Sequence, residues 1–362
     1  MAEIGIDASR MARARRTGTE QYTARLLEAL VRLPTAHHLT LYFKRLPVPA
    51  PAWPAHVSVR EMPFPRLWTH LRLSWEMARR PPDLLFVPAH VLPLVHPRRT
   101  VVTIHDLGYL YFPQTHPPLR RLELHLSTLW NARVAGRIIA VSQATKDDLV
   151  RRYRVPAERI RVVYHGVEER FRPTPDPAVP ARYGLPPRYF LYLGALHPRK
   201  NLERLLEAYA GLPEEAPPLV LAGPRGWYFE RIAAAIASLG LGRRVLLPGY
   251  IADEDVPAVL STALALVYPS LYEGFGLPAL EAMACATSVI ASRTSSLPEV
   301  VGEAGLLVDP LNVEELRTAM ARLLTDEELR AELGRRGREQ AAHFTWERCA
   351  RETLEVLEEA LE

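Results

Sequence analysis

Two glutamates, Glu273 and Glu281, stand eight residues apart in the stretch Tyr268–Ala284 (YPSLYEGFGLPALEAMA). Between them, Gly274 and Gly276 allow the backbone to turn tightly and to come close to a ligand. A carboxylate accepts hydroxyl hydrogens well, and a turn that opens a helix can hold an anion on its amides. The pattern therefore predicts a site for a phosphate together with a polyhydroxyl group.

A helix is predicted from about Leu277 to Ala284, because Pro278 suits the first helical turn and good helix formers follow it. The amides from Gly274 to Leu277, Phe275 included, then lie at the positive end of the helix dipole. An ordinary helix start with surface charges would look similar. Strand-like runs on both sides of the motif favour a binding site, since ligands bind at the carboxyl ends of parallel strands.

A second candidate group is the pair of cations Arg199 and Lys200, which precede a helix expected to open at Asn201. The helix dipole disfavours cations at this end, so we expect an anion to compensate them. Solvated linker charges are the alternative.

The length of 362 residues suggests about two domains, and 48% hydrophobic with 24% charged residues is typical of a globular protein. The sequence contains no apolar run of membrane-spanning length and begins with no leader pattern, so we expect a cytoplasmic protein. Cys285 and Cys349 have no metal-binding spacing.

The charge is unevenly distributed. Residues 1–175 contain 27 Lys and Arg against 14 Asp and Glu, a net of +13, whereas residues 176–362 have a net of −9. This asymmetry indicates an anionic partner for the first half, or solvated arginines on helix surfaces. The segment Arg66–Arg80 mixes tryptophan, leucine and arginine, a composition found both in helices on anionic membranes and in ordinary surface helices.

Strand and helix patterns alternate along the chain, which predicts α/β domains with parallel sheets. The strands expected in the first half are Ile4–Ala8, Leu39–Phe43, Leu84–Val87, Val101–Ile104, Ile138–Val141 and Val162–Tyr164. Those expected in the second half are Phe190–Leu193, Leu219–Ala222, Val245–Leu247, Leu264–Tyr268, Ser288–Ala291 and Leu306–Val308. Helical periodicity lies between them, and the tail from Asp326 is helical with a break near Phe344.

The fold class predicted from this alternation is α/β, with two Rossmann-like, doubly wound domains facing each other across a cleft. The expected divisions are a first domain at 1–171, a proline-rich linker at 172–188, a second domain at 189–344, and a C-terminal helix at 345–362.

Nearly the whole chain resembles the retaining glycosyltransferases of family 4, which have the GT-B fold. The matching stretches are PSLYEGFGLPALEAMA at 269–284, YLGALHPRKNLERLLEAY at 192–209, HD at 105–106, VYHGV at 163–167, SSLPEV at 295–300 and FTW at 344–346. The set is specific for the family and less specific for the sugar.

The resemblance implies that the domain at 1–171 binds the acceptor, that the domain at 189–344 binds the nucleotide sugar, and that the helix at 345–362 packs back on the first domain. It also implies roles for individual residues of the second domain. Glu281 would hydrogen-bond the ribose of the nucleotide, and Glu273 with the amides of Gly274 to Leu277 would hold the donor sugar. Arg199 and Lys200 would neutralise the diphosphate. Further nucleotide-binding positions are Gly249, Tyr250 and Ile251.

In the first domain, the resemblance implies that His105 contacts the donor sugar near the reacting centre. A histidine satisfied within the fold by its neighbour is the alternative. Gly18, in RRTGTEQY, matches the glycine loop that reaches the donor phosphate, and Arg15 and Arg16 beside it favour an anion.

The chain departs from the family at Ala195, where many members have an arginine that Arg199 could replace, and at Ala286–Ser288, where Gly-x-Pro is usual. Asp253-Glu254-Asp255 has the form of a metal-binding motif. Because it is expected to open a helix, we predict that its carboxylates cap the helix and interact with its dipole, and we predict no metal or other cofactor.

The predicted activity is retaining transfer from a nucleotide-diphosphate sugar to a saccharide or lipid-linked acceptor. GDP-mannose is the first candidate donor and a UDP-sugar the second. A sugar-nucleotide epimerase and an inactive nucleotide-binding subunit are the competing hypotheses. We expect no nucleic-acid partner, and a location in the cytoplasm that allows peripheral contact with the inner membrane face.

Overall fold

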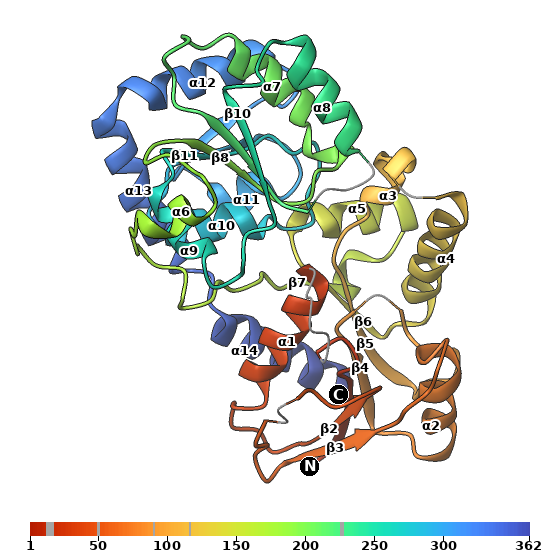
Figure 1. Cartoon of the computed structure of the whole chain (residues 1–362). Helices are drawn as coiled ribbons and strands as arrows, with labels where there is room; N and C mark the ends of the chain where they lie inside the picture. Colours follow the sequence, from red (N-terminus) through yellow and green to blue (C-terminus); the bar gives the residue numbers. More distant parts are fainter. Residues whose placement is uncertain (12–17, 49–50, 90, 116, 225–227) are drawn as a thin grey trace. The chain divides into compact units, whose positions relative to one another are not determined.

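The computed structural model describes residues 1–11, 18–48, 51–89, 91–115, 117–224 and 228–362. Within them the chain forms two compact units, each with its own internal contacts (Figure 1). The first unit contains Met1–Gly166 and Thr345–Glu362, and the second contains Val167–Phe344. No helix in these ranges combines the length and the hydropathy needed to span a bilayer.

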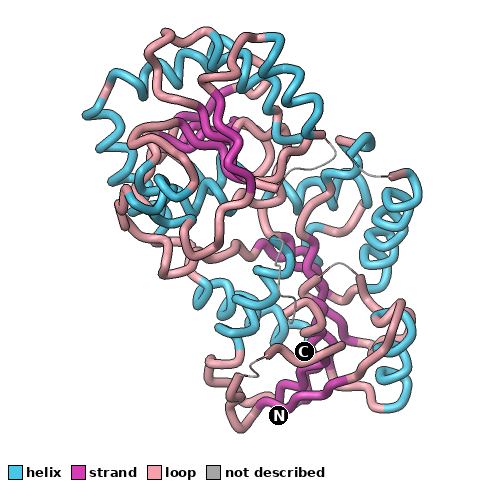
Figure 2. Tube along the Cα trace, in the orientation of Figure 1, coloured by secondary structure: helices cyan, strands magenta, loops and turns pink. Residues whose placement is uncertain are grey.

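The first unit is built on a seven-stranded parallel sheet in the order β3-β2-β1-β4-β5-β6-β7 (Figure 2). Its strands are β1 (Glu3–Asp7), β2 (His38–Phe43), β3 (Val57–Glu61), β4 (Leu84–Val87), β5 (Arg99–Ile104), β6 (Arg137–Ala140) and β7 (Ile160–Val162). Most are short apolar runs, because a central parallel strand is covered on both faces. The strand order reverses between β1 and β4, which makes that place a candidate ligand-binding edge.

Two details of this sheet differ from the sequence-based expectation. The edge strand β3 was not predicted, because its sequence VSVRE alternates polar and apolar residues and stays partly exposed. The last strand, expected at Val162–Tyr164, is Ile160–Val162.

Helices cover both faces of this sheet. They are α1 (Gly18–Leu30), α2 (Ser74–Arg79) preceded by the π-helical turn η1 (Thr69–Leu73), α3 (Gly108–Tyr111), α4 (Pro118–Val134), α5 (Gln143–Tyr153) and α14 (Trp346–Leu361); short 3-10 turns are η2 (Pro113–Thr115) and η3 (Ala157–Arg159). Side chains of α1 and α14 form one apolar core with the sheet, and those of α2, α4 and α5 form another.

The C-terminal helix α14 belongs to the first unit, where it packs along α1. A Cβ at Gly166 would lie 2.2 Å from the backbone nitrogen of Trp346, so the chain can pass the start of α14 only with glycine there. The Trp346 ring stacks on His165 with centroids 5.9 Å apart.

The second unit has a six-stranded parallel sheet in the order β10-β9-β8-β11-β12-β13. Its strands are β8 (Phe190–Leu193), β9 (Leu219–Ala222), β10 (Val245–Gly249), β11 (Ala265–Tyr268), β12 (Val289–Ser292) and β13 (Leu306–Val308). This is the order of a dinucleotide-binding fold, and its reversal falls between β8 and β11.

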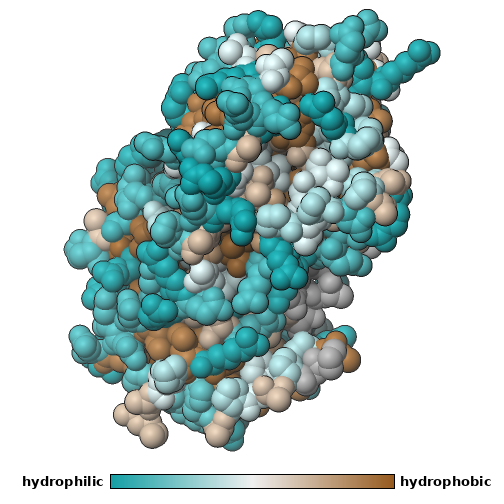
Figure 3. Space-filling model, turned by 90° about the vertical axis from the view of Figure 1, so that its left-hand side faces the viewer, coloured by the Kyte–Doolittle hydropathy of each residue, from teal (hydrophilic) through white to brown (hydrophobic). Residues whose placement is uncertain are grey.

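The helices of the second unit are α6 (Ala178–Arg182), α7 (Leu202–Ala210), α8 (Phe229–Ser238), α9 (Val256–Thr262), α10 (Leu277–Ala284), α11 (Leu297–Val301), α12 (Val313–Thr325) and α13 (Glu327–Ala341), with a 3-10 turn η4 (Pro198–Lys200). The helix α7 packs against α8 and α12, whereas α10 packs against α9, α11 and α13. In the view of Figure 3, hydrophilic residues cover most of the surface and hydrophobic ones form small patches. The predicted start of one helix, Trp227, lies outside the described residues.

The proline-rich segment at 172–188 lies within the second unit and includes α6. It is tied to Asp255, which forms an ion pair with Arg182 at 2.7 Å and accepts a hydrogen bond from the Tyr183 hydroxyl at 2.6 Å. Asp255 occupies the N-cap position of α9, but its side chain makes no capping hydrogen bond. The predicted capping bond is therefore wrong, whereas the predicted interaction of these carboxylates with the helix dipole stays a prediction.

Candidate active site

The candidate site lies at the carboxyl edge of the second sheet, where two loops follow the two central strands. One loop, from Gly194 to Lys200, follows β8, and the other, from Pro269 to Gly276, follows β11. Since β8 and β11 are hydrogen-bonded neighbours at the reversal of strand order, their loops must come close together. Ligands of open α/β sheets bind at this point.

Glycines line this edge of the sheet. A Cβ at Gly223, after β9, would lie 2.0 Å from the Gly194 carbonyl oxygen, so two backbones are in direct contact there. Gly249, at the end of β10, has φ 84°, and a Cβ would meet nothing within 4 Å. Tyr250, which follows it, is 62% exposed, while Ile251 is buried. The three predicted positions from Gly249 to Ile251 thus lie at the same edge.

The turn η4 directs Lys200 into the protein. After it, Asn201 adopts the left-handed conformation with φ 61°, and its Nδ2 donates to the Pro310 carbonyl at 2.6 Å. Asparagine tolerates this conformation better than most residues. The left-handed residue separates η4 from α7, and the buried Lys200 side chain contacts the end of β11 and the loop after it.

Lys200 and Glu273 form a buried ion pair between the two loops. The ammonium of Lys200 donates to Glu273 Oε1 and, at 2.9 Å, to the hydroxyl of Tyr268. Both charged residues are less than 9% exposed. The anion expected beside Lys200 is, in this structure, the carboxylate of Glu273.

The ion pair fixes the charge state of Glu273. Burial alone would raise the pKa of this carboxyl, but Lys200 and Arg199 outweigh it and hold the pKa below its usual value. Glu273 is therefore a carboxylate at neutral pH. Burial, with the negative charge of Glu273 nearby, raises the pKa of Tyr268 well above its ordinary value, so its hydroxyl stays protonated.

Backbone and hydroxyl hydrogen bonds hold the loop of Glu273 from both sides. The Leu271 N–H donates to the Arg199 carbonyl at 2.8 Å. The Glu273 N–H donates to Ser295 Oγ at 2.9 Å, and the fully buried Ser296 hydroxyl bridges the carbonyls of Glu273 and Phe275 at 3.0 and 2.7 Å. The loop is a preorganised element.

The start of α10 has the geometry of an anion-binding turn. Gly276 has φ 112°, a conformation that requires glycine, and its carbonyl accepts from Ala279 and Leu280. Among the described residues, no acceptor is found for the N–H groups of Gly274, Gly276 and Leu277. Amides at a helix N-terminus suit a phosphate.

Glu281 lies in the second turn of α10 in a different environment. Its side chain forms no hydrogen bond or ion pair within the described chain, and the residue is half-buried. Burial raises the pKa of Glu281 to about 8; Arg170 lowers it, while Glu168 and Asp253 raise it further.

The Arg170 side chain forms its hydrogen bonds with groups other than Glu281. It donates to both carboxylate oxygens of Glu168 at 3.2 Å and to the Asp253 carbonyl. Asp253 also accepts from the Tyr250 hydroxyl at 2.6 Å. The metal-like motif thus has Asp253 and Asp255 engaged in separate contacts, and no cluster of metal ligands is present in the ranges that the structure covers.

The first unit contains the remaining predicted residues. His105 follows β5, is buried, and donates from Nε2 to the Pro88 carbonyl at 2.9 Å. Its ring meets Tyr22 edge-on at 4.7 Å. Gly18 opens α1, is exposed, and has nothing within 4 Å of an added Cβ. Arg15 and Arg16 lie outside the described residues.

Sequence reasoning missed the residues that support the two glutamates. Tyr268 ended a predicted strand, and Ser295 and Ser296 lay in a family motif without a role. No role was predicted for Glu168 or Arg170. What marks these residues is that they are polar and buried next to the site. Because burial cannot be read from the sequence, no sequence signal could have found them.

Comparison with known proteins agrees with the fold. A model of glycosyl transferases group 1 matches residues 181–340, and a model of glycosyltransferase family 4 matches residues 16–171. The O-antigen chain mannosyltransferase B of Escherichia coli is 36% identical over 263 residues, which are 71% of this chain and 69% of that protein. The serotype-specific mannosyltransferase WbdA of Escherichia coli is 34% identical over 70% of this chain, but this chain covers only 32% of its length.

A solved structure of sucrose-phosphate synthase from Thermosynechococcus elongatus superposes with a TM-score of 0.77 at 25% identity, covering 99% of each chain. The two parallel α/β units, together with this structural similarity over the whole chain, define a glycosyltransferase of the GT-B fold. The chain belongs to glycosyltransferase family 4, whose group 1 members are retaining hexosyltransferases.

Proposed function

We propose that this protein transfers a mannosyl group from GDP-mannose, with retention of configuration and without a metal ion, to a saccharide or lipid-linked acceptor in polysaccharide assembly. The mannosyltransferases of Escherichia coli named above support the choice of sugar. The observation that carries the proposal is the buried Lys200–Glu273 pair beside the amides that open α10.

In the proposed complex, the diphosphate occupies the N-terminus of α10, near Lys200 and Arg199. These cations and amides stabilise the charge that grows on the leaving group. Glu273, ionised at neutral pH, accepts hydrogen bonds from the sugar hydroxyls. Glu281 accepts them from the ribose, with Gly249, Tyr250 and Ile251 beside the nucleotide.

Retention is proposed to occur on one face of the sugar, where the leaving phosphate takes the proton of the incoming hydroxyl. Lys200 already neutralises Glu273, which makes that carboxylate a poor nucleophile. Trapping a glycosyl group on a carboxylate of the enzyme would overturn this mechanism.

The test begins with a thermal-shift panel of GDP, UDP, ADP and their sugars. A ligand at a hundredfold excess over its dissociation constant adds about 2.7 kcal/mol of stability, so a selective shift identifies the base. Transfer or hydrolysis of radiolabelled GDP-mannose, with and without EDTA, then tests the activity. A thermal shift that is selective for UDP would replace GDP-mannose by a UDP-sugar as the proposed donor. Nucleotide binding without release of sugar would indicate an inactive subunit.

A further inference from the structure

An exposed apolar face covers one side of the first unit. It is formed by residues 66–80, which include η1 and α2, by the segment 91–98, and by the first half of α4, and we call it the α2–α4 face. Eight of the twelve large exposed hydrophobic residues of the described chain belong to it, each at least 47% exposed: Leu67, Leu71, Trp75, Leu94, Val95, Leu119, Leu122 and Leu126.

Contacts of the segment 91–98 join the two helices into one surface. The Val95 N–H donates to Ser74 Oγ on α2 at 3.2 Å. The His96 ring lies 6.0 Å from that of Trp130 on α4. Figure 1 shows α2 and α4 on the side of the sheet away from α1 and α14, in agreement with the two separate cores.

The first turns of α4 are only weakly covered by the rest of the unit. All six residues from Pro118 to Glu123 are exposed. Leu119, Leu122 and Leu126 recur at helical spacing, which places them on one stripe. Such a stripe normally packs on a core, so its exposure on the described chain calls for an occupant.

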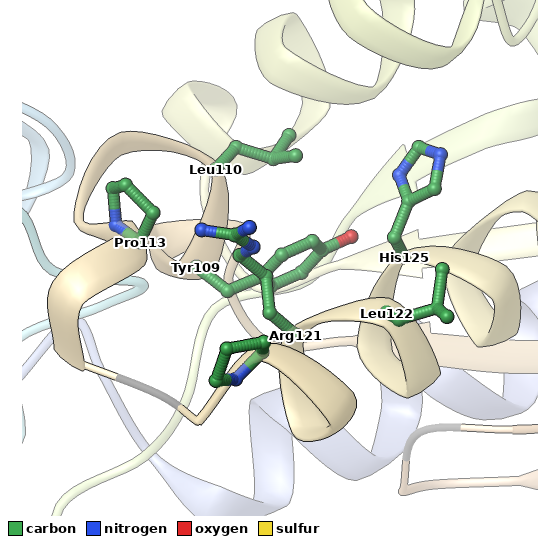
Figure 4. Close-up of a pocket in the computed structure, with 7 residues that line it drawn as sticks. Tyr109, Leu110, Pro113, Arg121, Leu122 and His125 are labelled. Carbon is green, nitrogen blue, oxygen red and sulfur yellow. The ribbon is translucent and has the colours of Figure 1, made fainter.

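A hollow of about 530 Å³ lies beside this stripe, between α3 and α4 (Figure 4). Leu110 and Pro113 border it on one side, and Arg121, Leu122 and His125 from α4 on the other, around the ring of Tyr109. The walls are largely apolar, and the guanidinium of Arg121 has no hydrogen-bond or ion-pair partner among the described residues.

Positive charge surrounds the apolar residues on every element of the face. The exposed arginines are Arg66, Arg79, Arg80, Arg98, Arg99, Arg120 and Arg121. The ring of Trp75 has the guanidinium groups of Arg72 and Arg79 each 4.8 Å from its centroid. The acidic residues are already paired, since Glu76 is buried against Arg60 and Arg72, and Glu123 lies 2.6 Å from Arg120.

We propose that the α2–α4 face docks on an anionic lipid bilayer. Leucine and tryptophan with arginine around them match the boundary between acyl chains and negative head groups. Arginine stems can lie along apolar surface while their charges stay in the head-group layer. The inference goes beyond the proposed transfer reaction and does not depend on the sugar.

The test measures co-flotation of the full chain with vesicles of phosphatidylcholine alone and of phosphatidylcholine mixed with phosphatidylglycerol. The wild type is expected to bind only the anionic vesicles, and more weakly at high salt. Two double variants, Leu71→Ser/Trp75→Ser and Leu119→Ser/Leu122→Ser, should each reduce binding by about tenfold or more. The matched control is Leu311→Ser, which removes a leucine of the second unit that is 62% exposed.

Folding of each variant is checked by circular dichroism and by nucleotide binding, which involves the second unit and separates failure of this inference from failure of the proposed function. Absence of binding to anionic vesicles at low salt would overturn the inference, as would binding that both double variants leave unchanged. Self-association of the wild type that the double variants abolish would assign the face to a second copy instead.

Discussion

Glu273 and Glu281 belong to one motif and lie in opposite environments. Glu273 is paired with Lys200, and its pKa is held below the usual range. Glu281 has no partner in the described structure, and burial raises its pKa to about 8. Environment, not residue type or spacing, assigns different roles to two like carboxylates.

The difference teaches what each carboxylate needs from a ligand. Glu273 already has a counter-ion, so it enters the reaction charged and fixed in place. The Glu281 side chain is mostly buried, and no protein group in the described ranges donates a hydrogen bond to it, although Arg170 lies near it together with Glu168 and Asp253. Ligand hydroxyls would supply the donors that the protein does not. Four substitutions can break or sharpen this comparison.

Removing the counter-ion should have the largest effect. Lys200→Met leaves Glu273 buried without its partner, which should cost about 3–5 kcal/mol of folding stability. Loss of the cation should also lower kcat by about 10² to 10³. Denaturant unfolding and steady-state kinetics measure the two effects.

The control for this substitution is the double variant Lys200→Met/Glu273→Gln. It should recover most of the stability, because no uncompensated charge remains buried, while activity stays low. Wild-type turnover in either variant would contradict the role assigned to the pair.

Gly276→Ala should disturb the turn between the two glutamates. A Cβ there would lie 2.7 Å from Leu297 Cδ2, and the φ of 112° is one that alanine rarely adopts. We therefore expect the variant to lose about 1–3 kcal/mol of folding stability and to bind the nucleotide more weakly. Gly184→Ala is the matched control, because Gly184 has φ 70° and open space around it. Equal losses in the two variants would show that backbone strain alone, without the Leu297 contact, explains the effect.

Glu281→Gln should change how stability depends on pH. A carboxyl whose pKa is raised from 4.5 to about 8 on folding binds more protons in the folded state, so the wild type loses stability as pH rises through this window. The loss is at most about 1.4 kcal/mol per pH unit, and the variant should lack it. Parallel stability curves between pH 5 and 8 would show that Glu281 is not perturbed.

Ser296→Ala should have the smallest effect. The variant loses the hydroxyl that bridges the carbonyls of Glu273 and Phe275, which should cost about 1–2 kcal/mol and loosen only the Glu273 side of the motif. Urea unfolding measures the stability, and the pH dependence attributed to Glu281 should be unchanged. A variant that alters that pH dependence would show that the two carboxylates are coupled.

Much of the fold could be predicted because local signals were strong. The helix Leu277–Ala284 was predicted with its observed bounds, from a glycine, a proline and a run of helix formers. The strands of the second sheet were short apolar runs between turn residues. The edge strand β3, half-exposed and polar at alternate positions, had no such signal.

The candidate site was predicted only in part, because its contacts join distant residues. Lys200 and Glu273 are 73 positions apart and meet because β8 and β11 are neighbours in the sheet. Glu168 and Arg170, which act on Glu281, precede it by more than a hundred residues. The order of strands in the sheet determines which distant residues come into contact, and local sequence periodicity does not reveal that order.

The most direct test of the site is the proton balance of nucleotide binding. GDP, with UDP in parallel, is titrated into the protein by calorimetry near pH 7.5, in two buffers that differ in ionisation enthalpy. If ribose hydroxyls donate to Glu281, its raised pKa falls on binding, and about half to three-quarters of a proton should be released per nucleotide. Glu281→Gln should bind more weakly and release none; equal proton release from both proteins, or none from the wild type, would contradict the assignment of Glu281 to the nucleotide.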